Sequence, residues 1–235
     1  MEMIYQYAIN TKKIVNINEV KEFLNIVSAE RKVKINRFYF QKDKVHSLFA
    51  EIILKYALWE QYGLNSTYIE FGQSKYGKPY LVNQKGLYFN LSHSGNWVLC
   101  GLGDTPIGLD VEEIKDKKMN LFNRIFTKEE HDFIFMQPLD QRIKTFYKIW
   151  TLKESYVKYI GKGLNIPFDS FLFQFNEDGI QFYLKGERDC SLVFTTGQLD
   201  GRHVISLCVK SQWNDRINSQ VKILTLEQLQ KWRNL

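Results

Sequence analysis

Two acidic residues near the middle of the chain are spaced so that they could bind a metal ion together. Asp110 and Glu112 lie two apart in the run 107–112, which predicts a strand, so their side chains share one face. Acidic residues are depleted in strands, and two on one face repel each other unless a positive group neutralises them. Carboxylates with room for water and phosphate oxygens are what Mg²⁺ prefers. Taken alone, the pair is explained equally well as a solvated strand end.

A second group of charges lies on a helix predicted over residues 141–160. Glu154 and Lys158 are one turn apart there, after Trp150, and Gly161-Lys162-Gly163 follows the helix. An isolated pair of this kind is usually an i,i+4 surface contact worth a few tenths of a kcal/mol. The aromatic residue before the pair and the glycine stop after it favour a functional motif, Trp150-Thr151-Leu152-Lys153-Glu154-Ser155.

Small polar residues and cations elsewhere could bind phosphate. His93 stands with Ser92 at the end of a predicted strand, where backbone N–H groups and hydroxyls can face a phosphate, although a lone histidine is more often structural. Arg31 and Lys34 share one face of a basic helix and could grip a phosphate, although a solvated basic face is the commoner explanation. The turn 76–80 contains Gly77-Lys78-Pro79 and does not have the spacing of a Walker loop.

The helices and strands that must position these residues are predicted to form two α+β halves, with the boundary between them near Thr105-Pro106. Helical periodicity and capping signals predict helices over 18–27, 28–38, 43–62 and 141–160, with a short helix after Thr127 and another after Thr225. Alternating or continuous apolar runs predict strands over 4–8, 68–71, 87–91, 97–102, 107–112, 171–175, 180–184, 192–195 and 204–209.

The bulk properties narrow the class of protein. With 235 residues, 44% of them hydrophobic, the chain can bury a core, and no apolar run is long enough to span a membrane. No signal peptide is recognisable, and the three cysteines show no CxxC spacing, so a reducing cytoplasm is expected. The net charge of +6 is spread along the chain, which argues against nucleic acid and suits a polyanionic ligand or an acidic protein partner.

Four motifs follow one another at 76–80, 89–95, 107–112 and 150–155. Their order and residue types resemble those of 4′-phosphopantetheinyl transferases of the surfactin-synthetase-activating type. The resemblance is close from about residue 28 to residue 167 and fades afterwards. It implies an α+β fold of two similar subdomains related by a pseudo-twofold axis, with the active site at their interface. The expected division is an N-terminal subdomain over 1–106 on the coenzyme A side, a C-terminal subdomain over 107–210 with the metal and the catalytic helix, and a tail over 211–235.

The resemblance also implies an activity. Enzymes of this family move the phosphopantetheine arm of coenzyme A onto a serine of an apo acyl, peptidyl or aryl carrier protein. Mg²⁺, or Mn²⁺ in its place, holds the pyrophosphate, the serine attacks the β-phosphate, and 3′,5′-ADP leaves. The chain length differs from that of the shorter synthase branch, whose chains associate to build one site, so a monomer is expected.

Residue roles follow from the resemblance, position by position. Asp110, Glu112 and Glu154 would bind the metal. Glu154 would also activate the serine, and Lys158 would hold the phosphates and help the leaving group depart, so that Glu154, Lys158 and Asp110 are the expected catalytic residues. The expected coenzyme A contacts, in addition to Lys158, are Arg31, Lys34, Ser47, Tyr76, Gly77, Lys78, Pro79, Ser92 and His93. The sequence departs from the family pattern at His46-Ser47, where an Arg-Thr type of pair is usual.

Two other functions remain open on the residues alone. A coenzyme A-dependent acyltransferase would need a base near a thioester and no metal, which leaves the three acidic positions without a role. A non-catalytic nucleotide- or nucleic-acid-binding protein would show no metal dependence, and salt-sensitive binding to DNA would favour it.

Overall fold

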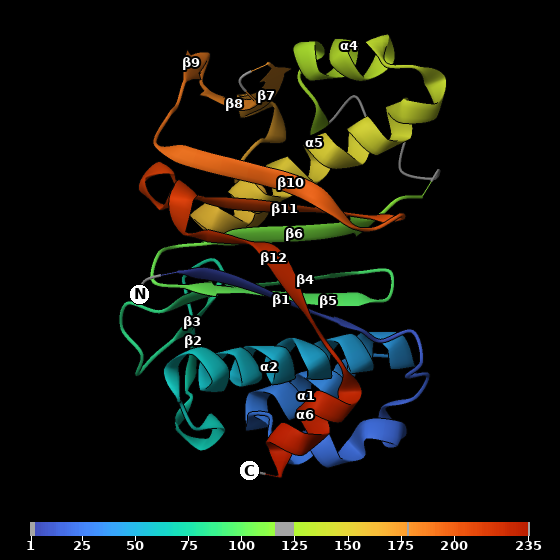
Figure 1. The fold of residues 1–235 in the computed structure, drawn as a ribbon, viewed down its shortest axis with the longest axis vertical. Helices are drawn as coiled ribbons and strands as arrows, with labels where there is room; N and C mark the ends of the chain where they lie inside the picture. The colour runs from blue at the N-terminus through green and yellow to red at the C-terminus, as the bar shows by residue number, and fades with distance from the viewer. Residues whose placement is uncertain (1–2, 116–124, 178, 235) are drawn as a thin grey trace.

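The computed structural model describes residues 3–115, 125–177 and 179–234. Two β-sheets lie face to face in the middle of the molecule, with helices α1, α2 and α6 on one outer side and α5 on the other (Figure 1). The fold is therefore α+β, with two halves of similar architecture, as predicted.

The N-terminal half is a four-stranded sheet covered by a long helix. Its sheet has the order β12-β1-β5-β4, in which β1, β5 and β4 are antiparallel neighbours. The elements are β1 (Ile4–Asn10), the 3₁₀ helix η1 (Ile17–Asn25), α1 (Ala29–Arg37), α2 (Gln41–Tyr62), η2 (Ser66–Tyr68), β2 (Phe71–Gln73), β3 (Pro79–Leu81), β4 (Tyr88–Ser94) and β5 (Trp97–Gly103).

The C-terminal half repeats this plan with a three-stranded sheet of order β10-β11-β6, against which α5 packs. A separate small sheet, β7-β8-β9, lies beyond α5. The elements are β6 (Gly108–Glu113), α4 (Lys128–Met136), α5 (Leu139–Ile160), η4 (Gly163–Asn165), η5 (Phe168–Ser170), β7 (Phe171–Asn176), β8 (Gly179–Leu184), β9 (Glu187–Arg188), β10 (Leu192–Asp200) and β11 (His203–Lys210).

The two long helices follow closely from local signals. Both α2 and α5 are 22 residues long, and each ends at a left-handed glycine, Gly63 with φ 65° and Gly161 with φ 73°. Glycine adopts this conformation without the steric cost that a Cβ brings, so each helix stops where the sequence predicts. The predicted helix over 18–27 differs, because residues 17–25 form a 3₁₀ helix that Asn16 caps together with Glu19.

Hydrophobic packing joins the halves. The facing sides of the two sheets contribute one cluster of buried residues, which includes Trp97 and Leu99 from β5, Leu109 and Val111 from β6, and Leu207 from β11. Separate clusters fill the space between α2 and its sheet, and between α5 and the elements around it. The sheets are therefore buried on both faces, and the interface between the halves is part of the core.

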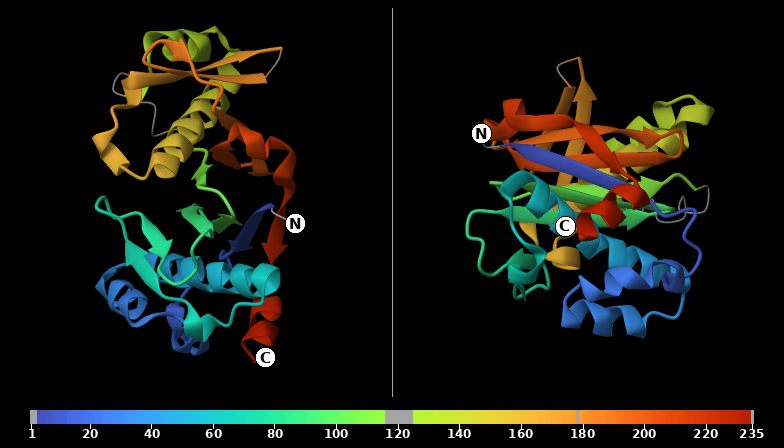
Figure 2. Two further views of the ribbon diagram at one scale, coloured as in Figure 1. Left: turned by 90° about the vertical axis from the view of Figure 1, so that its left-hand side faces the viewer. Right: turned by 60° about the horizontal axis from the view of Figure 1, so that its bottom comes forward.

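The end of the chain returns to the N-terminal half. Residues 217–224 form β12 (Ile217–Leu224), a strand that the sequence analysis did not predict, and it pairs in parallel with β1. Helix α6 (Leu226–Arg233) follows and lies beside α2 in Figures 1 and 2. Trp232 packs there with its ring 5.6 Å from that of Tyr56. The three-part division at residues 106 and 210 stays a prediction.

None of the helices in the described part of the chain is long and apolar enough to cross a membrane.

Candidate active site

Side chains join β4 to β6 along the seam between the halves. Residues 90, 92 and 94 lie on one face of β4, and each accepts a hydrogen bond from a main-chain N–H group of β6. We call this arrangement the seam ladder. Its pairs are Leu109 N to Asn90 Oδ1 at 2.9 Å, Val111 N to Ser92 Oγ at 3.2 Å, and Glu113 N to Ser94 Oγ at 3.0 Å.

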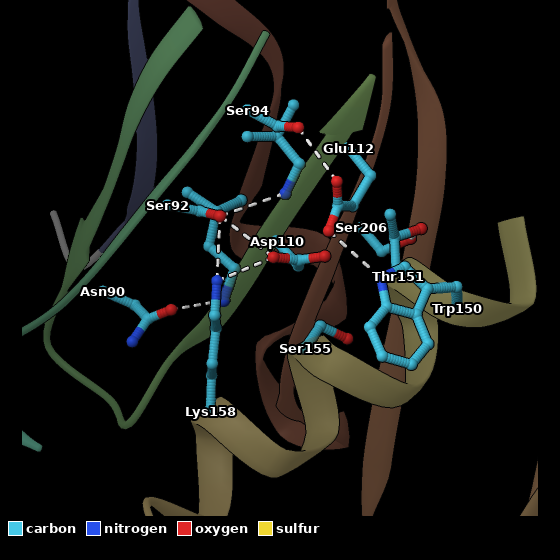
Figure 3. Close-up of polar contacts among 12 residues, drawn as sticks. Asn90, Ser92, Ser94, Asp110, Glu112, Trp150, Thr151, Ser155, Lys158 and Ser206 are labelled. Atoms are coloured by element: carbon cyan, nitrogen blue, oxygen red, sulfur yellow. Dashed lines mark hydrogen bonds and ion pairs between the residues drawn. The ribbon is translucent and has the colours of Figure 1, made fainter. Parts of the chain in front are cut away.

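The seam ladder also orients the two acidic side chains of β6 (Figure 3). Ser92 Oγ donates to Asp110 Oδ1 at 2.9 Å, and Ser94 Oγ donates to Glu112 Oε2, also at 2.9 Å. The indole Nε1 of Trp150 on α5 donates to the other oxygen of Glu112 at 3.1 Å. The carboxylates predicted to share a face therefore do so, and residues of both halves hold them.

Lys158 reaches the same point from α5. Its Nζ lies 2.7 Å from Asp110 Oδ1 and 2.8 Å from Ser92 Oγ. Asp110 is 4% exposed, and among the described residues its Oδ2 has no hydrogen-bond partner although it is buried. Burial raises the pKa of Asp110, Lys158 opposes this shift, and Glu112 adds to it. A buried carboxylate oxygen without a partner beside a second carboxylate fits a cation.

Glu154 is half-buried one turn before Lys158, and both residues line a groove of about 340 Å³. The turn from Tyr76 to Pro79 and Asn90 line the same groove. Within the described ranges, the structure gathers no group of three or more acidic, histidine or cysteine side chains that could hold a metal. Asp110 and Glu112 are brought together, and the expected role of Glu154 as their third ligand stays a prediction.

A second groove, of about 620 Å³, lies on the N-terminal half and carries cations. Arg31, Lys34 and Arg37 of α1 line it, together with Gly77 and Pro79, which also line the first groove. The turn 76–79 therefore borders both grooves. Burial lowers the pKa of Lys34, and the charge of Arg31 lowers it further. These two cations repel each other in the absence of an anion, which suits a phosphate ligand.

Arg31 is oriented by a buried carboxylate that sequence reasoning missed. Its Nε lies 3.1 Å from Glu51 Oε2, and its Nη1 donates to Ser47 Oγ at 3.4 Å. Glu51 is 1% exposed and also contacts Lys55 Nζ at 3.3 Å and the N–H of Ser28 at 2.6 Å. The only feature of the sequence that could have indicated a role for Glu51 is its position on α2, four residues before Lys55. Ser47 contacts Arg31, and the expected coenzyme A contacts of both residues stay predictions.

His93 lies against a second histidine. The ring centroids of His93 and His46 are 5.0 Å apart, and His46 is 3% exposed. Burial lowers the pKa of His46 to about 4. Burial also lowers the pKa of His93, and the charge of Lys158 lowers it further. Both imidazoles are therefore neutral near pH 7. His46, which departs from the family pattern, packs directly against one of the predicted site residues.

Two lysines of the motifs have internal partners. Lys78 Nζ contacts main-chain carbonyl oxygens of the C-terminal half, so its expected role as a charge for the ligand stays a prediction. Lys153 Nζ lies 2.8 Å from Glu130 Oε2, with both side chains 0% exposed, and donates to the carbonyls of Phe168 and Phe171. Lys153 therefore supports α5 from within the core, while the next residue, Glu154, faces the groove.

Comparisons with known proteins identify the family of this chain. A model for the N-terminal part of 4′-phosphopantetheinyl transferases matches residues 16–101, and a model of the 4′-phosphopantetheinyl transferase superfamily matches residues 106–208. The chain is 35% identical to a 4′-phosphopantetheinyl transferase of Bacillus subtilis over 173 residues, which cover 74% of this chain and 77% of that protein. It is 34% identical to 4′-phosphopantetheinyl transferase Sfp of Bacillus subtilis strain 168, with the same coverage.

Solved structures with a local likeness include the holo-[acyl-carrier-protein] synthase of Thermotoga maritima. That structure has 20% identity and a TM-score of 0.39, covering 45% of this chain and 62% of the synthase. The family models account for most of both halves, and the Bacillus subtilis relatives match about three quarters of the chain. The chain therefore belongs to the 4′-phosphopantetheinyl transferase superfamily, as the order of its four motifs predicted.

Proposed function

We propose that this protein transfers the 4′-phosphopantetheine arm of coenzyme A to a serine of an apo carrier protein, in a Mg²⁺-dependent reaction that releases 3′,5′-ADP. One observation carries the proposal beyond family membership. The buried Oδ2 of Asp110, which has no hydrogen-bond partner in the described part of the chain, lies beside Glu112 and within reach of Lys158, where a cation and a phosphate could be held together. The acyltransferase alternative gives this cluster no role.

The ligand would lie along both grooves. Arg31 and Lys34 would hold one phosphate group of coenzyme A, with Ser47 beside them, and the turn 76–79 would pass between the two ends of the ligand. Ser92 and His93, on the strand that borders the seam, would contact the pyrophosphate. Because two cations close together repel each other, an anionic ligand relieves a cost that the ligand-free protein carries.

Asp110, Glu112 and Glu154 would hold the Mg²⁺, which supplies positive charge to the pyrophosphate oxygens when it is bound. Lys158 would leave its partner Asp110 as the phosphates arrive and would stabilise the charge of the departing 3′,5′-ADP. Glu154 would accept the proton of the acceptor serine, directly or through one water. The remaining work of the protein is positioning, because phosphoryl transfer asks for little covalent chemistry from the protein.

The partner would be an acyl, peptidyl or aryl carrier domain. The chain has a net charge of +6, which would attract an acidic carrier surface at a distance. Both family models match parts of one chain, and this supports a working monomer that builds its site between its own halves. The three cysteines form no disulfide, which fits a cytoplasmic protein.

The decisive experiment weighs an apo carrier domain after incubation with the protein, coenzyme A and Mg²⁺. The wild type should add the mass of one phosphopantetheine arm, and excess chelator should stop the reaction. Asp110→Asn should abolish transfer, whereas the control Glu227→Gln, an exposed carboxylate on α6, should not change it. Transfer by Asp110→Asn at the wild-type rate would overturn the assignment. Acylation of the carrier from an acyl-coenzyme A without metal would favour the acyltransferase instead.

A further inference from the structure

Lys78 connects the two halves through its ammonium group. It lies in the turn between β2 and β3, in the N-terminal half, yet its Nζ donates to three carbonyl oxygens of the C-terminal half. The distances are 3.2 Å to Ile107 O, 2.6 Å to Lys158 O and 3.0 Å to Tyr159 O. An ammonium group has three protons, so these three acceptors account for all of its donors.

The acceptors belong to elements that position the site. Lys158 O and Tyr159 O are in the last turn of α5, where carbonyl groups lack partners within the helix and attract positive charge. Ile107 directly precedes β6, the strand that carries Asp110 and Glu112. One side chain of the other half therefore ties the end of α5 to the start of β6.

The contact to Ile107 continues the alternation of the seam ladder by one step. Side chains of β4 accept hydrogen bonds from the N–H groups of residues 109, 111 and 113, and Lys78 donates to the carbonyl oxygen of residue 107, just before β6. The path of the lysine also depends on a glycine. A Cβ added at Gly161, which has φ 73°, would lie 2.6 Å from Lys78 Cδ. The stem of Lys78 thus fits closely against the chain that leaves α5.

We propose that Lys78 is a positioning residue, whose ammonium fixes the last turn of α5 and thereby Lys158, rather than a charge that contacts the ligand. The inference rests on the proposed function, because Lys158 is there the residue that meets the phosphates. Lys158 Nζ reaches Asp110 and Ser92 at 2.7 and 2.8 Å, so a backbone shift of about 1 Å would break both contacts.

The test compares Lys78→Met, Lys78→Arg and the control Lys162→Met. Methionine keeps the length of the stem without its donors, and arginine keeps the charge and several donors. Lys162 is an exposed lysine just beyond α5 that lines a pocket together with Lys78, so its substitution removes one charge from the same region. Steady-state transfer to an apo carrier domain would be measured with coenzyme A as the varied substrate.

Lys78→Met should lower kcat by about 10- to 100-fold, the size expected for a misplaced catalytic group, while KM for coenzyme A stays within about threefold. Lys78→Arg should recover most of kcat, and Lys162→Met should resemble the wild type. A tenfold or larger increase in KM with kcat unchanged would show that the ammonium binds the ligand, which overturns the proposal.

Hydrogen exchange provides a readout that does not depend on activity. Without any ligand, the amides of residues 158–163 should exchange faster in Lys78→Met than in the wild type, whereas Lys162→Met should leave them unchanged. Unchanged exchange in Lys78→Met would overturn the proposal. Lys78→Gln, which keeps two donors, replaces it in both measurements if the methionine variant does not fold. If the wild type transfers nothing but exchange is still faster in Lys78→Met, the proposed function is refuted and the role of Lys78 in fixing the last turn of α5 stays supported.

Discussion

The two halves place a 22-residue helix against a sheet in the same way, yet they anchor it differently. On α2, Glu51 is shared by Arg31, Lys55 and Ser28, and the side chain of Arg31 remains 19% exposed at the edge of a groove. On α5, Lys153 pairs with Glu130, and both side chains are 0% exposed. The ion cluster around Glu51 therefore includes a partly exposed cation, Arg31, that can contact a ligand. The pair of Lys153 and Glu130 is fully buried and only stabilises the fold.

The halves also differ in where their carboxylates lie. The groove over α1 carries Arg31, Lys34 and Arg37, whereas the seam and α5 carry Asp110, Glu112 and Glu154, with Lys158 as the cation beside them. A phosphorylated ligand can bind to the cations directly, but it can approach the carboxylates only with a cation between them. Under the proposed function, the cations of the N-terminal half would bind phosphate groups of the ligand, and the C-terminal half would supply the metal-binding and catalytic side chains.

Replacing Glu154 with glutamine should break this division most strongly. Glu154→Gln keeps the shape of the side chain and loses the base, so the chemical step should fall by at least about 10². Coenzyme A should still bind within roughly tenfold, about 1.4 kcal/mol. Single-turnover transfer and calorimetry would separate the two effects, with Glu154→Asp between the extremes. An equal loss of binding and chemistry would make Glu154 a metal ligand only.

The contrast between the ion clusters predicts different costs for removing a lysine. Lys153→Met leaves Glu130 buried without its ammonium partner and should lower the free energy of unfolding by about 3–5 kcal/mol. Lys55→Met should cost only about 1–2 kcal/mol, because Glu51 keeps Arg31 and the N–H of Ser28. Urea unfolding of both variants measures the difference. Equal losses of stability in the two variants would show that the additional partners of Glu51 do not compensate for the loss of its lysine.

His46 should make the N-terminal half sensitive to acid. Its pKa of about 4 in the folded protein, lowered by burial, His93 and Lys42, lies below the ordinary 6.5. The unfolded chain therefore binds more protons between these values, so stability rises with pH across this window and is lost as the pH falls through it. Between pH 6.5 and pH 4 the wild type should lose about 3 kcal/mol more than His46→Leu.

The measurement for His46 is urea unfolding at several pH values, with His131→Asn as the control. The side chain of His131 is 39% exposed on α4, so its substitution should leave the acid sensitivity as it is in the wild type. Parallel stability curves for the wild type and His46→Leu would show that the buried imidazole has no such effect.

The smallest expected effect concerns the cations of α1. Lys34→Ala should weaken coenzyme A binding by about tenfold, or 1.4 kcal/mol. It should leave the stability of the ligand-free protein unchanged or slightly higher, because Arg31 no longer has a like charge nearby. Calorimetry at two salt concentrations would measure the binding, with Lys32→Ala on an exposed position of the same helix as the control. If Lys34→Ala lowers the stability of the protein and leaves its affinity for coenzyme A unchanged, Lys34 has a structural role and does not bind the ligand.

Parts of the fold and site could be predicted because their signals are local. The helices predicted over 43–62 and 141–160 begin two residues later than α2 and α5 and end at the same residues, since apolar periodicity and a following glycine mark the ends. Asp110 and Glu112 share a face because a strand has a period of two. Strand β12 was missed because it depends on pairing with β1, at the other end of the chain.

The amino-acid sequence by itself determined the family, the two long helices and the acidic pair on β6, because motif order, periodicity and caps are properties of neighbouring residues. Only the tertiary structure decided which partners the charged groups have. Lys158 meets Ser92 across 66 positions of sequence, and Lys78 meets the carbonyl of Lys158 across 80. Such contacts depend on how the two halves pack. A pattern among neighbouring residues cannot predict which side chains of the other half will lie close by. For the same reason, only the tertiary structure shows that the ammonium group of Lys78 contacts the end of α5.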